Sequence, residues 1–173
     1  MSLPTFFLAY GDYSQLTPAS FRKVIEATPT KALSEITIGE LCSMSDYPNG
    51  VYFIFGGNLR QLQYVGKCTS RSFIERIPAH FDQREWAWFN TLPKKLMQNG
   101  QCYSAALGES LDFEIVLFGI RDREAACVLE RVFRYSYMPM LNTLKGLKDF
   151  DANATLDKLG NNLDCPIQET ALF

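Results

Sequence analysis

The chain contains 173 residues, of which 47% are hydrophobic and 21% charged, and this composition is typical of one globular domain with a packed core. The chain has a formal net charge of −2, whereas nucleic-acid-binding proteins usually have an excess of basic residues. A local basic groove is still compatible with this net charge. Five cysteines at spacings unlike those of zinc ligands favour reduced thiols in an intracellular, cytoplasmic protein. No apolar run approaches the roughly 18 residues of a membrane span.

The first elements surround a predicted hairpin. Within residues 1–47, "PASFRKVIEATP" predicts a helix between two prolines, in a region that we expect to be an extension packed on the main domain. Residues 50–66 form two apolar runs around Gly-Gly-Asn, a pattern typical of a β-hairpin. The next segment, "TSRSFIERIPAHF", predicts a short or bent helix, because Ser70 or Ser72 can cap it and Pro78 interrupts it.

The second half predicts two helices and one strand. The segment "REWAWFNTLPKKLMQNG" predicts a helix broken at Pro93, and "LDFEIVLFGI" is a strand rich in β-forming residues. A strongly amphipathic helix follows in "RDREAACVLERVFRYSY", where Asp122 can serve as the N-cap. Residues 146–173 are polar and are expected to form a loosely packed extension. This order predicts an α/β fold with a small three-stranded antiparallel sheet flanked by helices.

The hairpin contains an unusual pairing of residue types. Each run places a glycine beside a tyrosine, as Gly50-Val51-Tyr52 in the first and Tyr64-Val65-Gly66 in the second, and Lys67 follows directly. Glycine weakens a strand unless a bulge or a close approach of another group requires it. We therefore interpret the two glycines as positions where a phosphate or a backbone comes close, or simply as strand ends.

Four further polar residues interrupt the apolar pattern downstream. Arg76 and His80 are one helical turn apart, so they share a face if the helix survives Pro78. Glu130 is the acidic residue in the apolar middle of the last helix, and Asn142 follows in the loop after it.

Taken in this order, the set resembles the GIY-YIG nuclease superfamily, whose pattern is Gly-Ile-Tyr, Tyr-Ile-Gly, a helical Arg, often a His, then a Glu and an Asn. Here valine replaces isoleucine in both motifs, and the resemblance covers residues 48–145. It implies a metal-dependent endonuclease that hydrolyses phosphodiester bonds of duplex or branched DNA. It also implies Tyr52 as the general base or water-orienting residue, with Tyr64 lining the same pocket. Both tyrosines should then lie on one face of the hairpin and point at Glu130.

The residue types suit this chemistry. A helical Glu130 can hold one Mg²⁺ or Mn²⁺, because Mg²⁺ keeps several waters and takes further ligands from the substrate phosphate. Arg76 offers a bidentate fork to the scissile phosphate. Lys67 and His80 can lower the pKa of a neighbouring phenol or donate a hydrogen bond to it. Asn142 is expected to stabilise the turn that orients the hairpin.

Each residue also has a structural interpretation. Tyr52 and Tyr64 could be ordinary cross-strand aromatics, and Glu130 could pair with an arginine of its own helix. Cys68 lacks a base nearby in the sequence, so we do not interpret it as a nucleophile. The basic and aromatic residues of "REWAWFNTLPKKL" could contact nucleic acid, but an amphipathic helix that buries its tryptophans is favoured.

Two functions remain open from the sequence. The first is the endonuclease, whose acidic net charge suggests weak intrinsic affinity for DNA, with specificity supplied by the extensions, a partner protein or a homodimer. The alternative is a non-catalytic module that keeps the same fold and binds nucleic acid or protein.

Overall fold

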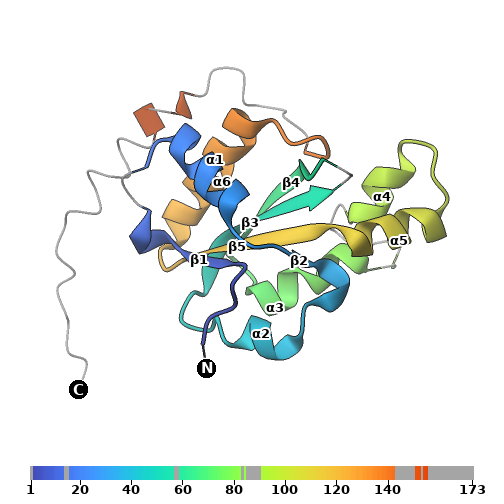
Figure 1. Ribbon diagram of the computed structural model, residues 1–173, viewed down its shortest axis with the longest axis horizontal. Helices are drawn as coiled ribbons and strands as arrows, with labels where there is room; N and C mark the ends of the chain where they lie inside the picture. Colours follow the sequence, from blue (N-terminus) through green and yellow to red (C-terminus); the bar gives the residue numbers. More distant parts are fainter. Residues whose placement is uncertain are drawn as a thin grey trace.

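The structure is a computed structural model that describes residues 2–13, 16–56, 59–82, 84, 91–142, 151–152 and 154–155. A five-stranded mixed sheet lies between two layers of helices (Figure 1). Helices α1 (Pro18–Ala27) and α6 (Arg123–Tyr137) cover one face. The other face is covered by α2 (Ile38–Cys42), α3 (Phe73–Arg76), α4 (Leu92–Met97) and α5 (Tyr103–Asp112).

The strand order is β1-β5-β3-β4, with β2 also paired to β5. The strands are β1 (Phe7–Ala9), β2 (Lys31–Ala32), β3 (Asn49–Gly56), β4 (Gln61–Cys68) and β5 (Glu114–Ile120). The α/β class is confirmed, but the expected three-stranded antiparallel sheet is wrong. Strands β3, β4 and β5 are antiparallel as expected, whereas the N-terminal region adds β1, parallel to β5, and β2, antiparallel to it. These short strands satisfy backbone groups along an edge of β5 that would otherwise be unpaired.

Both faces of the sheet are buried, which explains why the strands appear in the sequence as continuous apolar runs. Tyr52 and Ile54 of β3 pack with the helices α2 to α5. Val51 and Phe53, which alternate with them, pack against α1 and α6. Polar side chains therefore have little room over the centre of the sheet.

The predicted helices of the α1/α6 layer are confirmed. Thr17 caps α1 by accepting a hydrogen bond from the Ser20 backbone, and α1 buries Phe21 and Ile25. Asp122 caps α6 by accepting hydrogen bonds from the first backbone N–H groups of the helix. Helix α6 ends at Tyr137, and its C-cap, Met138, has a left-handed backbone conformation.

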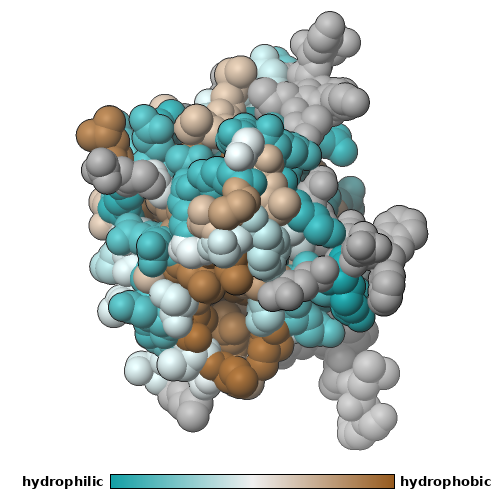
Figure 2. Space-filling view, turned by 90° about the vertical axis from the view of Figure 1, so that its right-hand side faces the viewer, coloured by the Kyte–Doolittle hydropathy of each residue, from teal (hydrophilic) through white to brown (hydrophobic). Residues whose placement is uncertain are grey.

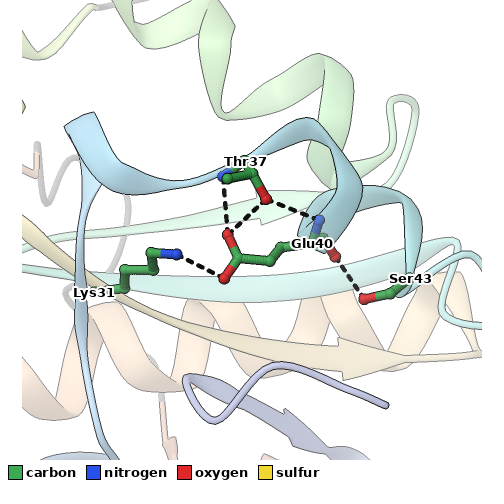
Figure 3. Close-up of polar contacts among 4 residues, drawn as sticks. All are labelled: Lys31, Thr37, Glu40 and Ser43. Carbon is green, nitrogen blue, oxygen red and sulfur yellow. Dashed lines mark hydrogen bonds and ion pairs between the residues drawn. The ribbon is translucent and has the colours of Figure 1, made fainter. Parts of the chain in front are cut away.

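The N-terminus of α2 is fixed by reciprocal hydrogen bonds (Figure 3). The Glu40 carboxylate accepts from the backbone N–H and the hydroxyl of Thr37, and the Thr37 hydroxyl accepts from the Glu40 backbone. Lys31 also donates to Glu40 over 2.6 Å, and this hydrogen bond, together with those from Thr37, lowers the pKa of Glu40 to about 2. The contact joins β2 to α2 and so fixes one side of the helical layer.

The helical segment after the hairpin is short and bent, as the sequence predicts. Helix α3 ends at Arg76, and a 3₁₀ turn, η3 (Pro78–Phe81), continues the chain in a new direction. Ser72 begins α3, and its backbone N–H and hydroxyl both donate to Glu75. Further on, α4 begins beside Pro93 instead of being broken by it, since proline suits the first turn of a helix.

Helix α5 was not predicted from the sequence. Its residues, "YSAALGESLD", include a glycine and have little amphipathic pattern, so propensity gives a weak signal. Figure 2 shows the side of the molecule where α4 and α5 lie in Figure 1, with a hydrophobic area bordered by hydrophilic side chains.

Two further 3₁₀ turns, η1 (Tyr10–Asp12) and η2 (Leu33–Glu35), connect the N-terminal elements. Within the described residues, no helix has the length and apolar character needed to cross a membrane.

The two glycines of the hairpin make room for aromatic rings of the chain itself. Gly66 lies opposite Tyr52, and a Cβ at Gly66 would overlap the Tyr52 ring. A Cβ at Gly50 would overlap the ring of Phe73 and the backbone oxygen of Phe118. Tyr52 therefore lies flat against β4, and this packing sets the direction of its hydroxyl.

We predict that Gly66→Ala destabilises the fold by about 2 kcal/mol or more, because the new methyl group overpacks a fully buried ring. Gly108→Ala in α5 is the matched control. A Cβ there meets nothing within 4 Å, so helix propensity should raise the free energy of unfolding by about 0.5–1 kcal/mol. Urea unfolding followed by circular dichroism measures both, and equal stability of Gly66→Ala and the parent would contradict the packing.

Candidate functional site

Three rings form the centre of the site. Because Tyr52 pairs with Gly66, Tyr64 lies on the same face of the hairpin, and the centroids of the two phenol rings are 6.1 Å apart. The predicted common face of the two tyrosines is therefore confirmed. The His80 ring lies 5.5 Å from that of Tyr52 and 5.3 Å from that of Tyr64.

A buried hydrogen bond joins two of these rings. The Tyr52 hydroxyl lies 2.7 Å from Nε2 of His80, and both side chains are 0% exposed. Arg76 also hydrogen-bonds Tyr52, although the chain bends between Arg76 and His80. A guanidinium can only donate, so the Tyr52 oxygen accepts from Arg76. The direction of the hydrogen bond between Tyr52 and His80 follows the tautomer of the imidazole. The second ring nitrogen of His80, Nδ1, is buried and has no hydrogen-bond partner among the described residues.

Burial controls the protonation of these groups. Burial raises the pKa of Tyr52 well above its usual value, and the opposing charge of Arg76 does not offset it. Burial likewise raises the pKa of Tyr64, again against the effect of Arg76. Burial, with the charges of Arg76 and Lys95, lowers the pKa of His80 to about 3. At neutral pH both phenols are therefore protonated and the imidazole is uncharged.

Glu130 reaches the site from the opposite face of the sheet. It is 8% exposed, and its Oε1 accepts from Nη1 of Arg134 over 3.0 Å, one turn further along α6. Its Oε2 lies 3.8 Å from Nζ of Lys67, on β4. The sequence-based alternative of an ion pair within the helix is thus present in the structure.

The expectation that Tyr52 points at Glu130 is wrong. Helix α6 packs on the face of β3 that carries Val51 and Phe53, whereas Tyr52 points to the other face and meets His80. Tyr64 belongs to the edge strand β4, and the charges of both Glu130 and Arg134 influence its pKa. Tyr64 is therefore the phenol at which the two layers meet.

Positive charge gathers around this edge. Lys95 of α4 places Nζ 5.6 Å from the centroid of the Tyr64 ring and donates to the backbone oxygen of Leu141 over 2.6 Å. Among the described residues, the cluster along this edge consists of four cations and one carboxylate: Lys67, Arg76, Lys95, Arg134 and Glu130. It has a formal excess of three positive charges in a chain whose net charge is −2. Such a local field favours an anionic ligand.

A pocket opens beside this cluster, in the loop between β4 and α3. Its volume is about 190 Å³, and it is lined by Lys67, Cys68, Thr69, Ser70, Arg71 and Arg76. Three cations and two hydroxyls suit the oxygen atoms of a phosphate. Burial raises the pKa of the Cys68 thiol far above its usual range, so the thiol is protonated and a poor nucleophile, in agreement with the sequence interpretation.

Glu130 meets the minimum requirement for binding one hard cation. No group of three or more His, Cys, Asp or Glu side chains that could hold a metal occurs among the described residues. A single carboxylate suffices only where waters and substrate oxygens supply the other ligands, as for Mg²⁺. Oε2 of Glu130 is the oxygen that would take part, because its ion pair with Nζ of Lys67, at 3.8 Å, is longer than a hydrogen bond.

Asn142 supports the edge of β4 next to Tyr64. Its side chain accepts from the Val65 backbone N–H over 2.7 Å and donates to the Val65 oxygen over 2.8 Å. The Leu141 N–H donates to the Gln63 oxygen in the same way. The chain after α6 thus covers the outer edge of β4. It forms hydrogen bonds with Gln63 and Val65, the neighbours of Tyr64 on either side.

Sequence reasoning placed Lys67, Arg76 and Glu130 in the site but did not place Arg134 or Lys95 there. The lysine belonged to a segment interpreted as an amphipathic helix, and nothing in its spacing linked it to the hairpin. Trp86, Trp88 and Phe89 of that segment lie outside the described residues, as does nearly all of the C-terminal extension. Cys42, Cys68, Cys102 and Cys127 are free thiols.

Comparison with known proteins yields no match to a protein-family model, a curated protein or a solved structure.

The buried His80 predicts acid sensitivity. Its pKa is about 3 in the folded chain and near 6.5 when unfolded, so between these values the unfolded state binds a proton that the folded state does not. Stability should therefore fall as the pH drops below 6.5, by on the order of 2 kcal/mol between pH 7 and pH 5 from this residue.

Urea unfolding of the parent and of His80→Gln at both pH values measures this contribution. Gln can still hydrogen-bond the Tyr52 hydroxyl but does not titrate, so the variant should lose less stability on acidification. An identical loss in parent and variant would show that His80 is not the responsible group.

Proposed function

We propose that the protein is a metal-dependent endonuclease that hydrolyses phosphodiester bonds of DNA through a site like that of the GIY-YIG nucleases. The observation that carries this proposal is convergence. Side chains from β3, β4, α3, η3 and α6, chosen from the sequence for their order, lie around one edge strand: Tyr52, Tyr64, Lys67, Arg76, His80 and Glu130. The positive excess at this edge supports an anionic substrate in an otherwise acidic chain.

Arg76 and Lys67 are the proposed ligands of the scissile phosphate. Both line the pocket between β4 and α3, and they reach it from different elements. Guanidinium and ammonium groups neutralise the charge that builds up on the phosphate oxygens as water attacks phosphorus and the bond to the leaving oxygen breaks. The products are a phosphate monoester and a hydroxyl group.

The two phenols have different proposed roles. Tyr64 lies at the edge where the cations and Glu130 meet, so we assign to it the contact with the attacking water and the acceptance of its proton. Tyr52 was expected to be the general base, but its hydroxyl is buried and hydrogen-bonded to Nε2 of His80. Its better supported role is to position Arg76, with which it shares a hydrogen bond.

Glu130 is the proposed ligand of one Mg²⁺ or Mn²⁺. When bound, such an ion would neutralise charge on the phosphate and stabilise the leaving oxygen. Lys67 and Arg134 hold the carboxylate in place from two directions. Asn142 fixes the adjacent stretch of β4 through Val65.

A second candidate function is a binding module without catalysis. The observation that favours it is the pairing of Glu130 with Arg134 at 3.0 Å and with Lys67 at 3.8 Å, which already compensates the carboxylate. Such a module would use the same cations to bind nucleic acid and would have no need for a divalent ion.

A nicking assay separates the two functions. Purified protein with Mg²⁺ or Mn²⁺ should convert supercoiled plasmid to the open circle, and Arg76→Ala and Glu130→Ala should each lower the rate at least a hundredfold. Glu124→Ala is the matched control, because it removes a carboxylate from the exposed first turn of the same helix. It should retain the parent rate.

Several results would contradict the endonuclease. Absence of cleavage of duplex, branched and single-stranded DNA by the parent with either metal would favour the binding module. Equal nicking by Glu130→Ala and the parent would indicate a contaminating nuclease.

The pH dependence of nicking tests the assignment of the phenols. The raised pKa of Tyr64 means that only a small fraction is ionised at pH 7, and this fraction grows about tenfold per pH unit below that pKa. The rate should therefore rise between pH 7 and pH 9. Tyr64→Phe should abolish this rise, whereas Tyr52→Phe should lower the rate and keep its slope. The reverse pattern would return the role of base to Tyr52.

A further inference from the structure

The cluster contains two cations that the proposed chemistry does not bring to the scissile phosphate. Lys95 comes from α4 and lies over the Tyr64 ring, while Arg134 comes from α6 and lies beside Glu130. Both side chains are half-buried, and they approach β4 from opposite faces of the sheet. Neither position belongs to the motif set that was chosen from the sequence.

Both cations lie close enough to Tyr64 to act on it: Nζ of Lys95 is 5.6 Å from the ring centroid, and the charge of Arg134 influences the pKa of the phenol. The pKa of Lys95 is lowered by its burial and further by the charge of Arg134, so the pair repel each other in a partly dehydrated place. Arg134 is compensated by Glu130, but Lys95 meets the neutral backbone oxygen of Leu141. An anion between the two would offset the repulsion.

The pair lies away from the pocket along β4. Tyr64 and Lys67 are three residues apart, which is about 10 Å along a strand. Arg134 is one turn beyond Glu130 on α6, about 5 Å along the helix axis. Lys67, Arg76 and the pocket therefore mark one end of the cluster, and Lys95 and Arg134 mark the other, with Tyr64 between them.

We propose that Lys95 and Arg134 form a second phosphate subsite, which binds a backbone phosphate on the Tyr64 side of the scissile bond. This inference rests on the proposed nuclease function and makes it more specific. The substrate must be a polynucleotide that carries at least one further phosphate beside the one that is cleaved. The subsite also gives α4 a function, because this helix brings the lysine to the edge of β4.

The first test measures binding without catalysis. Binding of a fluorescent DNA oligonucleotide in EDTA, followed by anisotropy at several salt concentrations, is compared for the parent, Lys95→Met and Lys94→Met. Lys94→Met is the matched control, because Lys94 is on the same helix but donates to the Arg84 backbone. Lys95→Met should weaken binding about tenfold and reduce the slope of log Kd against log salt by about one, while Lys94→Met should do neither.

The second test identifies the phosphate. Oligonucleotides with one uncharged methylphosphonate at successive positions should show one position beside the cleaved bond whose neutralisation weakens binding by the parent about tenfold. Lys95→Met should be insensitive to neutralisation at that position and should remain sensitive at the scissile phosphate. Lys95→Arg keeps the charge and should restore the parent pattern. If Lys95 mattered only through its hydrogen bond to the Leu141 oxygen, its replacement would not change the sensitivity to one particular phosphate.

The outcomes separate this inference from the function on which it rests. A parent protein that neither binds nor cleaves DNA overturns both. A parent that cleaves DNA, with Lys95→Met equal to Lys94→Met in affinity and salt slope, overturns the subsite alone. The subsite is also overturned if binding by Lys95→Met is weakened by a methylphosphonate at every position as much as binding by the parent is.

Discussion

A sheet that is buried on both faces can present polar side chains only at its edges, and this constraint decides where the candidate site lies. Strands β3 and β5 are central and almost wholly apolar on both sides, so their side chains belong to the two cores. Strand β4 is at the edge of the path β1-β5-β3-β4. It is there that Tyr64 of one layer meets Glu130 and Arg134 of the other. The sheet order thus brings together residues that the helices separate.

The hydrogen bond between Tyr52 and His80 gives this edge a rigid support. Both groups are buried and uncharged, and the glycine opposite Tyr52 lets its ring lie against β4. The same hydroxyl holds Arg76 at the end of a helix of only four residues. A short helix followed by a 3₁₀ turn has little stability of its own, so contacts of this kind position its charged side chain. The buried polar pair therefore supports the site by orienting Arg76.

The charge of the whole chain gives a misleading view of the site. The net charge of −2 argues against nucleic acid as a partner, but four cations and one carboxylate of the described residues lie together along the edge at β4. Local potential depends on which charges lie within a few ångströms of each other, and screening weakens the effect of the more distant ones. Lys95 and Arg134 extend this basic region beyond the residues suited to one phosphate.

The sequence by itself determined the hairpin, the helices at 18–27 and 123–137, the break at Pro78 and the motif residues that meet at the candidate site. These features depend on local signals, such as alternation, N-cap residues and proline, that act within a few positions. Only the tertiary structure decided that β1 and β2 complete the sheet, that Tyr52 turns to His80, and that Lys95 joins the edge of β4. Each of these depends on which face of a strand a distant helix covers, and local spacing carries no information on that choice.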